Sequence, residues 1–265
     1  MRALTGRRIV ESPALRPLLL LIALLVLWQA AVSLFTIPKW LIPAPLEVIN
    51  EIGKEWPRLW RDGLVTGYAS LLGFLMSVAI GIPLAMAIAY SRVIESFLYP
   101  ILVFSQTVPK IAIAPLFVVW FGFGVFPKVI SGFLLAFFPI VVATVTGFKS
   151  VDRDMIDLVR SMRASRLQTF AMISFPFALP SIFAGMKVAV TLAVVGAVVG
   201  EFVGSNSGLG YLLQIANGNF DLPLMFAALV VLAFIGVLFF VVLEAIERLT
   251  LPWHASQRAD LAATL

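Results

Sequence analysis

The sequence predicts an all-α membrane protein with about six transmembrane helices. Three observations lead to this class. Hydrophobic residues make up 61% of the 265 residues and charged residues only 12%, whereas soluble domains are about 45–50% apolar and about 25% charged. Six mainly apolar stretches reach the roughly 20 residues that a helix needs to cross a bilayer. Because lipid offers the backbone no hydrogen bonds, these stretches are expected to be helical.

The expected spans divide the chain into an N-terminal segment (1–16), a transmembrane domain (17–250) and a tail (251–265). The spans lie near residues 17–37, 64–90, 97–121, 125–148, 174–203 and 223–247. The first follows several arginines, as a secretory signal would, but it is longer than a typical signal core, so we expect an uncleaved anchor. An even number of spans places both termini on one side.

The basic residues indicate that this side is the cytoplasm. Most of the 19 lysines and arginines lie in the N-terminal segment, in the polar segment 149–173 and near the C-terminus. Cytoplasmic loops of membrane proteins carry the excess of Lys and Arg. Five basic residues are then expected on the outer side: Lys39, Lys54, Arg58, Arg61 and Lys128.

Segment 149–173, called the cytoplasmic loop below, is predicted to form two short amphipathic helices. Met155, Leu158, Val159 and Met162 recur at i, i+3, i+4 and i+7, and the pattern changes phase near Arg163 to Ser165, which predicts a turn there. We expect the apolar stripe to seat the loop against its own membrane domain. The loop is either an interfacial helix whose arginines meet anionic headgroups or a docking element for a cytoplasmic partner.

Polar residues within the spans are candidates for a translocation path. The candidates are Gln106, Lys110, Lys187, Gly200 and Glu201. Lys110 lies between two prolines that remove backbone donors and break the helix. It therefore either attracts an anionic substrate or bonds the freed carbonyls.

The two charged candidates of the fifth span lie too far apart to pair with each other. Lys187 either lines the path or extends to the cytoplasmic interface. Glu201 lies about 21 Å further along the helix and either neutralises a charge on another span or lines the outer mouth. Gly196, Gly200 and Gly204 repeat every four residues, which indicates either plain helix packing or a sliding surface. The outer loop that follows suits a re-entrant or gating element.

Several classes of chemistry lack the residues they need. The chain has no cysteine and one histidine, His254, so thiolate and HExxH metal sites are excluded. It has no P-loop and no GxSxG motif. We therefore assign no catalytic residue and no metal ligand, and we expect a protein that is not an enzyme.

The cytoplasmic loop resembles the EAA loop of permease subunits in ATP-binding cassette (ABC) importers. That pattern is E-A-A, a glycine four residues later, and I-x-L-P ten residues beyond the glycine. Aligned on Pro176, this chain has Asp157, Leu158 and Val159 at E-A-A, Arg163 at the glycine, and Ile173 with Pro176 at I-x-L-P. Further stretches resemble the nitrate, taurine, alkanesulfonate and pyrimidine-precursor branch: IPAPLEV, TVPKIAIAPLFVVWFGFG, FALPSIFAGMKVAV, GEFVGSNSGLGYLL and ERLTLPWH.

The resemblance implies a permease of the type I importer fold in the bacterial inner membrane. It also implies a homodimer that works with two cytoplasmic ATPase subunits and an extracytoplasmic substrate-binding protein. ATP and Mg would be bound by the ATPase subunits, and no cofactor by this chain. The transported solute would be small, such as nitrate, a sulfonate like taurine, or a vitamin precursor.

In this family the EAA loop inserts into a groove on the ATPase and acts as a coupling helix. The contact residues that this implies are Asp157, Leu158, Val159, Arg160, Ser161, Arg163, Ala164, Ser165, Ile173 and Pro176. Arg163 departs from the family, because glycine tolerates positive φ more readily than a residue with a side chain. Either the turn avoids that conformation, or the ATPase groove differs to suit a larger loop.

The alternative function is an ion-gradient-driven secondary transporter whose cytoplasmic loop lies on lipid. An inverted repeat and acidic residues near the middle of the membrane would favour it. The sequence shows no convincing repeat, and the acid expected within a span, Glu201, lies near its end.

Overall fold

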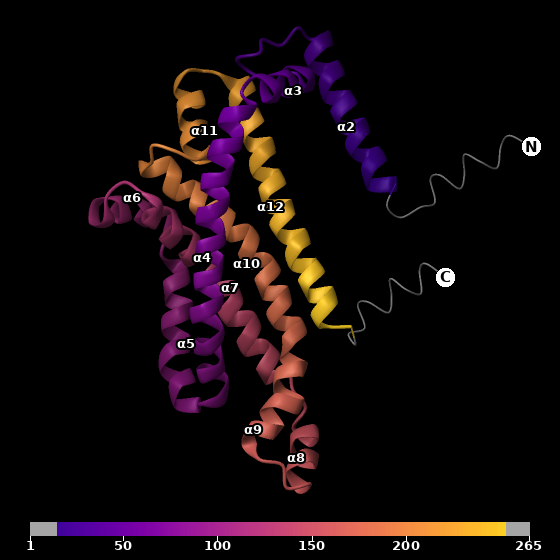
Figure 1. The fold of residues 1–265 in the computed structure, drawn as a ribbon, viewed down its shortest axis with the longest axis vertical. Helices are drawn as coiled ribbons and strands as arrows, with labels where there is room; N and C mark the ends of the chain where they lie inside the picture. The colour runs from indigo at the N-terminus through magenta and orange to yellow at the C-terminus, as the bar shows by residue number, and fades with distance from the viewer. Residues whose placement is uncertain (1–14, 253–265) are drawn as a thin grey trace, which may run out of the picture. The chain divides into compact units, whose positions relative to one another are not determined.

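A computed structural model describes residues 15–252, and every regular element in this range is a helix (Figure 1). Most of the N-terminal segment and most of the tail lie outside the described residues. The helices are α2 (Leu15–Leu34), α3 (Pro45–Lys54), α4 (Trp56–Tyr90), α5 (Arg92–Thr107), α6 (Lys110–Phe121), α7 (Val125–Lys149), α8 (Arg153–Ser161), α9 (Arg166–Thr169), a π-helical turn (Phe170–Ser174), α10 (Phe175–Gly204), α11 (Leu209–Gly218) and α12 (Leu222–Thr250).

The chain forms two compact units. The first contains Met1–Trp60 and Leu212–Val230, and the second contains Arg61–Tyr211 and Val231–Leu265. In the first unit, the backbone N–H of Leu46 donates to the side-chain oxygen of Gln29 at 3.2 Å. Trp28 lies against Phe226, with their ring centroids 5.7 Å apart. All the predicted site residues belong to the second unit.

Four apolar helical segments of the described chain are long enough to cross a membrane: α4, the continuous stretch Arg166–Gly204, α7 and α12. The expected span near 97–121 is not one helix, because α5 and α6 meet at an angle of 93°. Counted as one span, this pair makes five. The described part of α2, Leu18–Leu34, is a shorter apolar helix. The predicted count of six spans is therefore not established.

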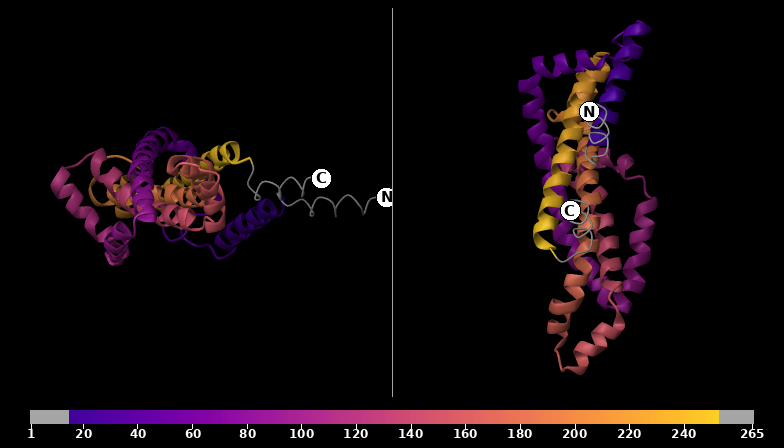
Figure 2. Two further views of the ribbon diagram at one scale, coloured as in Figure 1. Left: turned by 90° about the horizontal axis from the view of Figure 1, so that it is seen from below. Right: turned by 90° about the vertical axis from the view of Figure 1, so that its right-hand side faces the viewer.

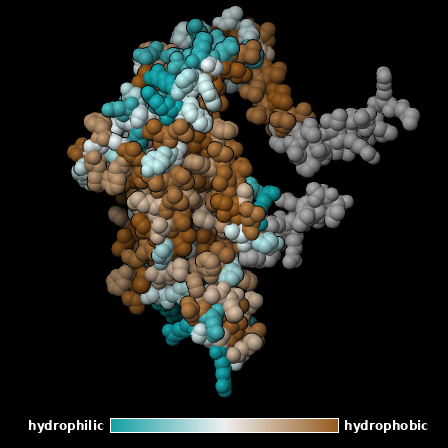
Figure 3. Space-filling model, viewed as in Figure 1, coloured by the Kyte–Doolittle hydropathy of each residue, from teal (hydrophilic) through white to brown (hydrophobic). Residues whose placement is uncertain are grey.

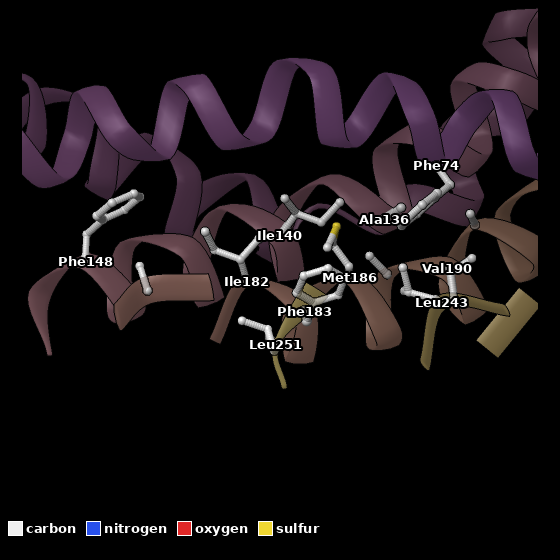
Figure 4. Packing of buried hydrophobic residues seen from close by; sticks show 13 residues of the cluster. Phe74, Ala136, Ile140, Phe148, Ile182, Phe183, Met186, Val190, Leu243 and Leu251 are labelled. Atoms are coloured by element: carbon white, nitrogen blue, oxygen red, sulfur yellow. The ribbon is translucent and has the colours of Figure 1, made fainter. Parts of the chain in front are cut away.

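The core of the second unit lies where α7 packs along α10 (Figure 4). Ile140 of α7 and Ile182, Phe183 and Met186 of α10 are buried there. The surface over the middle of these helices is hydrophobic, and hydrophilic residues reappear at the end formed by α8 and α9 (Figure 3). The same two short helices lie at one end of α7 and α10 in the second view of Figure 2. This distribution suits a helix pair in lipid with a polar loop outside it.

Glycines of α10 let α7 approach closely. A Cβ at Gly196 would lie 2.5 Å from the Ser131 carbonyl oxygen and 2.7 Å from the Gly132 Cα, and one at Gly200 would lie 2.9 Å from the Lys128 Cα. A Cβ essentially never lies under 3.0 Å from such atoms. Of the two alternatives for the glycine repeat, the structure shows helix packing at Gly196 and Gly200.

We predict that Gly196→Leu destabilises the protein, because the new side chain would collide with the α7 backbone. Overpacking a tight contact costs about 1–3 kcal/mol and occasionally more. The purified variant in detergent should unfold at a lower temperature than the unmodified chain. The control is Val195→Leu on the same helix, since Val195 is exposed. Equal melting temperatures for the two variants would contradict the packing shown.

Candidate functional site

The first candidate site is the break between α5 and α6. Val108 is extended, with φ −75° and ψ 123°, as expected for the residue before a proline. Pro109 has no N–H and begins the first turn of α6, in which its carbonyl accepts from the N–H of Ala112 at 2.9 Å. Pro115 lies inside α6 without ending it. The predicted break therefore occurs at Pro109 alone.

Two of the five predicted path residues flank this break. Lys110 Nζ donates to the side-chain oxygen of Gln106 at 3.4 Å and lies 5.9 Å from the ring centroid of Phe138. Gln106 is exposed and Lys110 is partly buried. Lys110 thus bonds a side chain rather than a freed carbonyl. In the described chain, the side-chain hydrogen bonds at the break stay within α5 and α6.

The other three path candidates make contacts inside the second unit. Glu201 is fully buried, and its carboxylate lies 3.6 Å from Lys128 Nζ. Of the two alternatives for Glu201, the structure shows that it neutralises a charge on another helix. Gly200 packs on α7 as described above. Lys187 forms an ion pair with Glu247 of α12, and its Nζ lies 5.8 Å from the ring centroid of Phe240.

The structure shows a burial of Lys128 that the sequence did not predict, and it adds residues that sequence reasoning missed. Lys128 is 2% exposed, and the carboxylate of Glu201 compensates its charge. Asp62 and Thr66 on α4 are also buried, and the Thr66 hydroxyl donates to the Glu201 carboxylate. Their spacing of four residues on one helix was the signal available. Glu247 was missed because it lies in the last turn of an apolar helix.

The second candidate site is the cytoplasmic loop, which is attached to the helices by aromatic rings. Phe170 of the π-helical turn stacks on Phe148 at the end of α7, with centroids 5.9 Å apart and planes at 19°. Tyr90 of α4 lies 5.7 Å from Phe148, and Phe175 of α10 lies 5.7 Å from Phe170. We call these four residues the aromatic root. Three helices thus hold the base of the loop.

The loop contains two helices joined by a turn at Arg163, as the phase change indicated. Arg163 has a φ of 62°, so the turn does not avoid the left-handed conformation. The Arg163 N–H donates to the Arg160 carbonyl at 2.9 Å and the Ala164 N–H to the Val159 carbonyl at 3.3 Å, which is the Schellman pattern at a helix end. Ser165 then caps α9 by accepting from the Gln168 N–H at 3.2 Å.

The expectation that the apolar stripe faces the membrane domain is wrong. Leu158 is 63% exposed and Met162 is 75% exposed. The aromatic root, not the stripe, attaches the loop to the helices. Periodicity therefore identified an apolar face but not the surface against which it packs. Asp157 and Arg160 lie 3.8 Å apart on the same helix and are both exposed. In the described residues, no group of three or more His, Asp or Glu side chains could hold a metal ion.

We predict that Arg163→Gly stabilises the loop turn. A left-handed residue with a Cβ costs roughly 1–2 kcal/mol, which glycine avoids at some cost in entropy. Hydrogen exchange at the Arg163 and Ala164 amide positions should slow. The control is Arg160→Gly, because position 160 is helical and glycine there costs about 1 kcal/mol, which should speed the same exchange. The turn assignment would be wrong if the two variants changed exchange in the same direction.

Comparisons with known proteins agree with these observations. Residues 77–252 match the family described as binding-protein-dependent transport system inner membrane component. The chain is 40% identical over 251 residues to the riboflavin transport system permease protein RibX of Chloroflexus aurantiacus, covering 93% of this chain and 92% of that protein. It is 37% identical over 245 residues to the formylaminopyrimidine transport permease protein ThiX of Halalkalibacterium halodurans, covering 92% and 98%.

The fold also resembles that of a solved transporter. A chain of the MetNI methionine ABC transporter in an inward-facing conformation matches with a TM-score of 0.64 at 20% identity, covering 74% of this chain and 97% of that one. The resemblance inferred from the sequence is confirmed, and the secondary-transporter alternative is set aside. The chain belongs to the family of inner membrane components of binding-protein-dependent transport systems and is a membrane-spanning permease subunit of an ABC importer for a small solute.

Proposed function

We propose that this permease imports a small heterocyclic compound and is driven by ATPase subunits that bind its cytoplasmic loop. The exposed apolar surface of that loop is the observation that carries the proposal. Two copies of the chain form the path, and an extracytoplasmic binding protein delivers the solute. ATP and Mg are bound, and ATP is hydrolysed, by the ATPase subunits. Both termini lie in the cytoplasm of a bacterial cell.

The composition of the loop supports a protein partner rather than lipid alone. Leu158 and Met162 are exposed, and Asp157, Arg160 and Arg163, which are exposed as well, lie beside them in the sequence. Protein interfaces have such an apolar centre with a charged rim. Other residues predicted to contact the ATPase stabilise the shape of the loop. Ser161 donates to the Leu158 carbonyl at 2.6 Å. Ile173 and Pro176 are partly buried and lie close in sequence to the aromatic root.

The aromatic root supports the proposal that movement of the ATPase is transmitted to the membrane helices. When ATP closes the two ATPase subunits, the bound loops move with them. Because Phe148, Phe170 and Tyr90 join the loop to α7 and α4, those helices follow. Packed elements move as bodies rather than deforming continuously. The translocation cavity between the two permease copies then opens to the outer side, and ATP hydrolysis returns the transporter to its starting state.

We place the break between α5 and α6 on the translocation path. Polar and charged side chains within a membrane segment usually face a water-filled cavity or another protein element. Gln106 provides an amide, and Lys110 provides an ammonium group that lies over the Phe138 ring. The relatives at 37–40% identity are named for formylaminopyrimidine and riboflavin. We therefore favour a heterocycle among the solutes that the sequence left open.

We predict that the Leu158→Asp, Met162→Asp double variant loses the ATPase. Burying new carboxylates in an apolar contact is costly, and a loss of 1.4 kcal/mol weakens binding tenfold. Co-purification of the partner ATPase with the tagged permease should fall at least about tenfold. Leu249→Asp is the control, since Leu249 is exposed on α12, outside the loop. Normal co-purification with the double variant would disprove loop docking.

We predict that Lys110→Met slows uptake without loosening the complex. Hydrogen bonds to charged groups contribute about 1.5–3 kcal/mol, so uptake into proteoliposomes should fall roughly tenfold or more. Lys110→Arg should retain most activity, and Lys54→Met, an exposed lysine on α3, should retain all of it. A Lys110→Met variant with normal uptake would remove this residue from the path.

A further inference from the structure

The turn between α10 and α11, residues 205–208, lies far from the cytoplasmic loop. The 30 residues of α10 separate the two by about 45 Å. The helix ends at Gly204 because Ser205 is extended, with φ −141° and ψ 157°. The sequence suggested a re-entrant or gating element in this region.

Four consecutive backbone groups at this turn are each bonded by a different side chain. These bonds are Lys128 Nζ to the Ser207 carbonyl at 2.7 Å, the Gly208 N–H to Asp62 Oδ1 at 3.1 Å, the Leu209 N–H to Thr66 Oγ1 at 2.9 Å, and the Gly210 N–H to Glu201 Oε2 at 2.9 Å. The side chains come from α4, α7 and α10. One short stretch of backbone is thus tied to three helices.

We call the four side chains the anchor cluster, and three of them, Thr66, Lys128 and Glu201, also interact with one another. Thr66 Oγ1 donates to Glu201 Oε2 at 2.8 Å, and Lys128 Nζ lies 3.6 Å from Glu201 Oε1. Asp62, Thr66, Lys128 and Glu201 are each no more than 2% exposed. Buried charges are tolerated when they are paired and their remaining hydrogen-bonding groups are satisfied. Here the turn backbone supplies those remaining partners.

The turn also fits Glu201 in shape. Gly208 has a φ of 105°, and a Cβ there would lie 2.1 Å from Glu201 Oε1. A Cβ on Gly210 would lie 2.8 Å from the Glu201 Cβ. Both glycines are therefore needed for the backbone to approach the carboxylate. Moving the turn away would remove the hydrogen bond of the buried Asp62 carboxylate and one hydrogen bond each from Lys128 and Glu201, so the contact favours one position.

We propose that the anchor cluster keeps this turn and the start of α11 fixed on α4, α7 and α10 throughout the transport cycle. The turn is then not the moving gate. Opening takes place at other elements, and among residues 15–252 the break between α5 and α6 has no such set of side-chain bonds to other helices. Asp62, Thr66, Lys128 and Glu201 act as positioning residues. The part that concerns the cycle rests on the proposed ATP-driven function.

The test uses the absence of native cysteine, which makes single introduced thiols specific probes. Leu209→Cys places a thiol at a fully buried position of the turn, and Gln106→Cys places one at the exposed break. The complex with its ATPase is treated with a maleimide, first without nucleotide and then trapped with ATP and vanadate. We expect Leu209→Cys to stay unlabelled in both states and labelling of Gln106→Cys to change. Labelling of Leu209→Cys in either state would overturn the proposal.

A second part of the labelling experiment needs no nucleotide. Adding Glu201→Gln to Leu209→Cys should speed labelling at least tenfold, because the charge that holds Lys128 and the turn is removed. Val190→Cys, buried in the α10 core, should stay protected in the same Glu201→Gln background, which separates local release from unfolding. Thr66→Val serves the same purpose if Glu201→Gln does not insert. Continued protection of Leu209→Cys in these variants would show that the cluster does not hold the turn.

The two proposals can fail separately. If labelling of Gln106→Cys is the same in both nucleotide states, the proposed ATP-driven opening at the break is contradicted. The effect of Glu201→Gln on Leu209→Cys would still decide whether the anchor cluster fixes the turn.

Discussion

A backbone group without a hydrogen-bond partner costs several kcal/mol in hydrocarbon, and this constraint decides where the chain can leave the helical conformation. The second unit interrupts its helices in two contrasting ways. At residues 205–208, side chains from three helices bond the backbone. At Val108 and Pro109, the side-chain bonds of the described chain are local. The first interruption is closed by the protein itself, whereas the second suits contact with water, solute or another chain.

The pairing of α7 with α10 connects these interruptions to the cytoplasmic loop. The loop leaves α7 at Lys149 and enters α10 at Phe175, so the two helices that pack most closely also hold both ends of the loop. Glycines along α10 bring the backbones together, and the aromatic root joins them at the base. A displacement of the loop therefore acts on a helix pair rather than on a single helix.

Local features of the structure could be predicted from the sequence, and features that depend on folding could not. Two helices in the loop and the turn at Arg163 follow from periodicity, which acts over a few residues. The burial of Lys128 was not predictable, because hydropathy shows only its neighbours along the chain, whereas the burial depends on Glu201 more than 70 residues away. The direction of the stripe with Leu158 likewise depends on packing. The break at Pro109 was predictable from proline chemistry, but its 93° angle was not.

The Schellman turn at Arg163 and the serine cap after it give the cytoplasmic loop its shape before any partner arrives. A flexible loop would lose conformational freedom on association, and that loss would weaken binding. Here the ordering occurs when the permease folds. The loop that we propose as the ATPase contact is therefore a protrusion of fixed outline, which would favour partners whose groove already matches that outline.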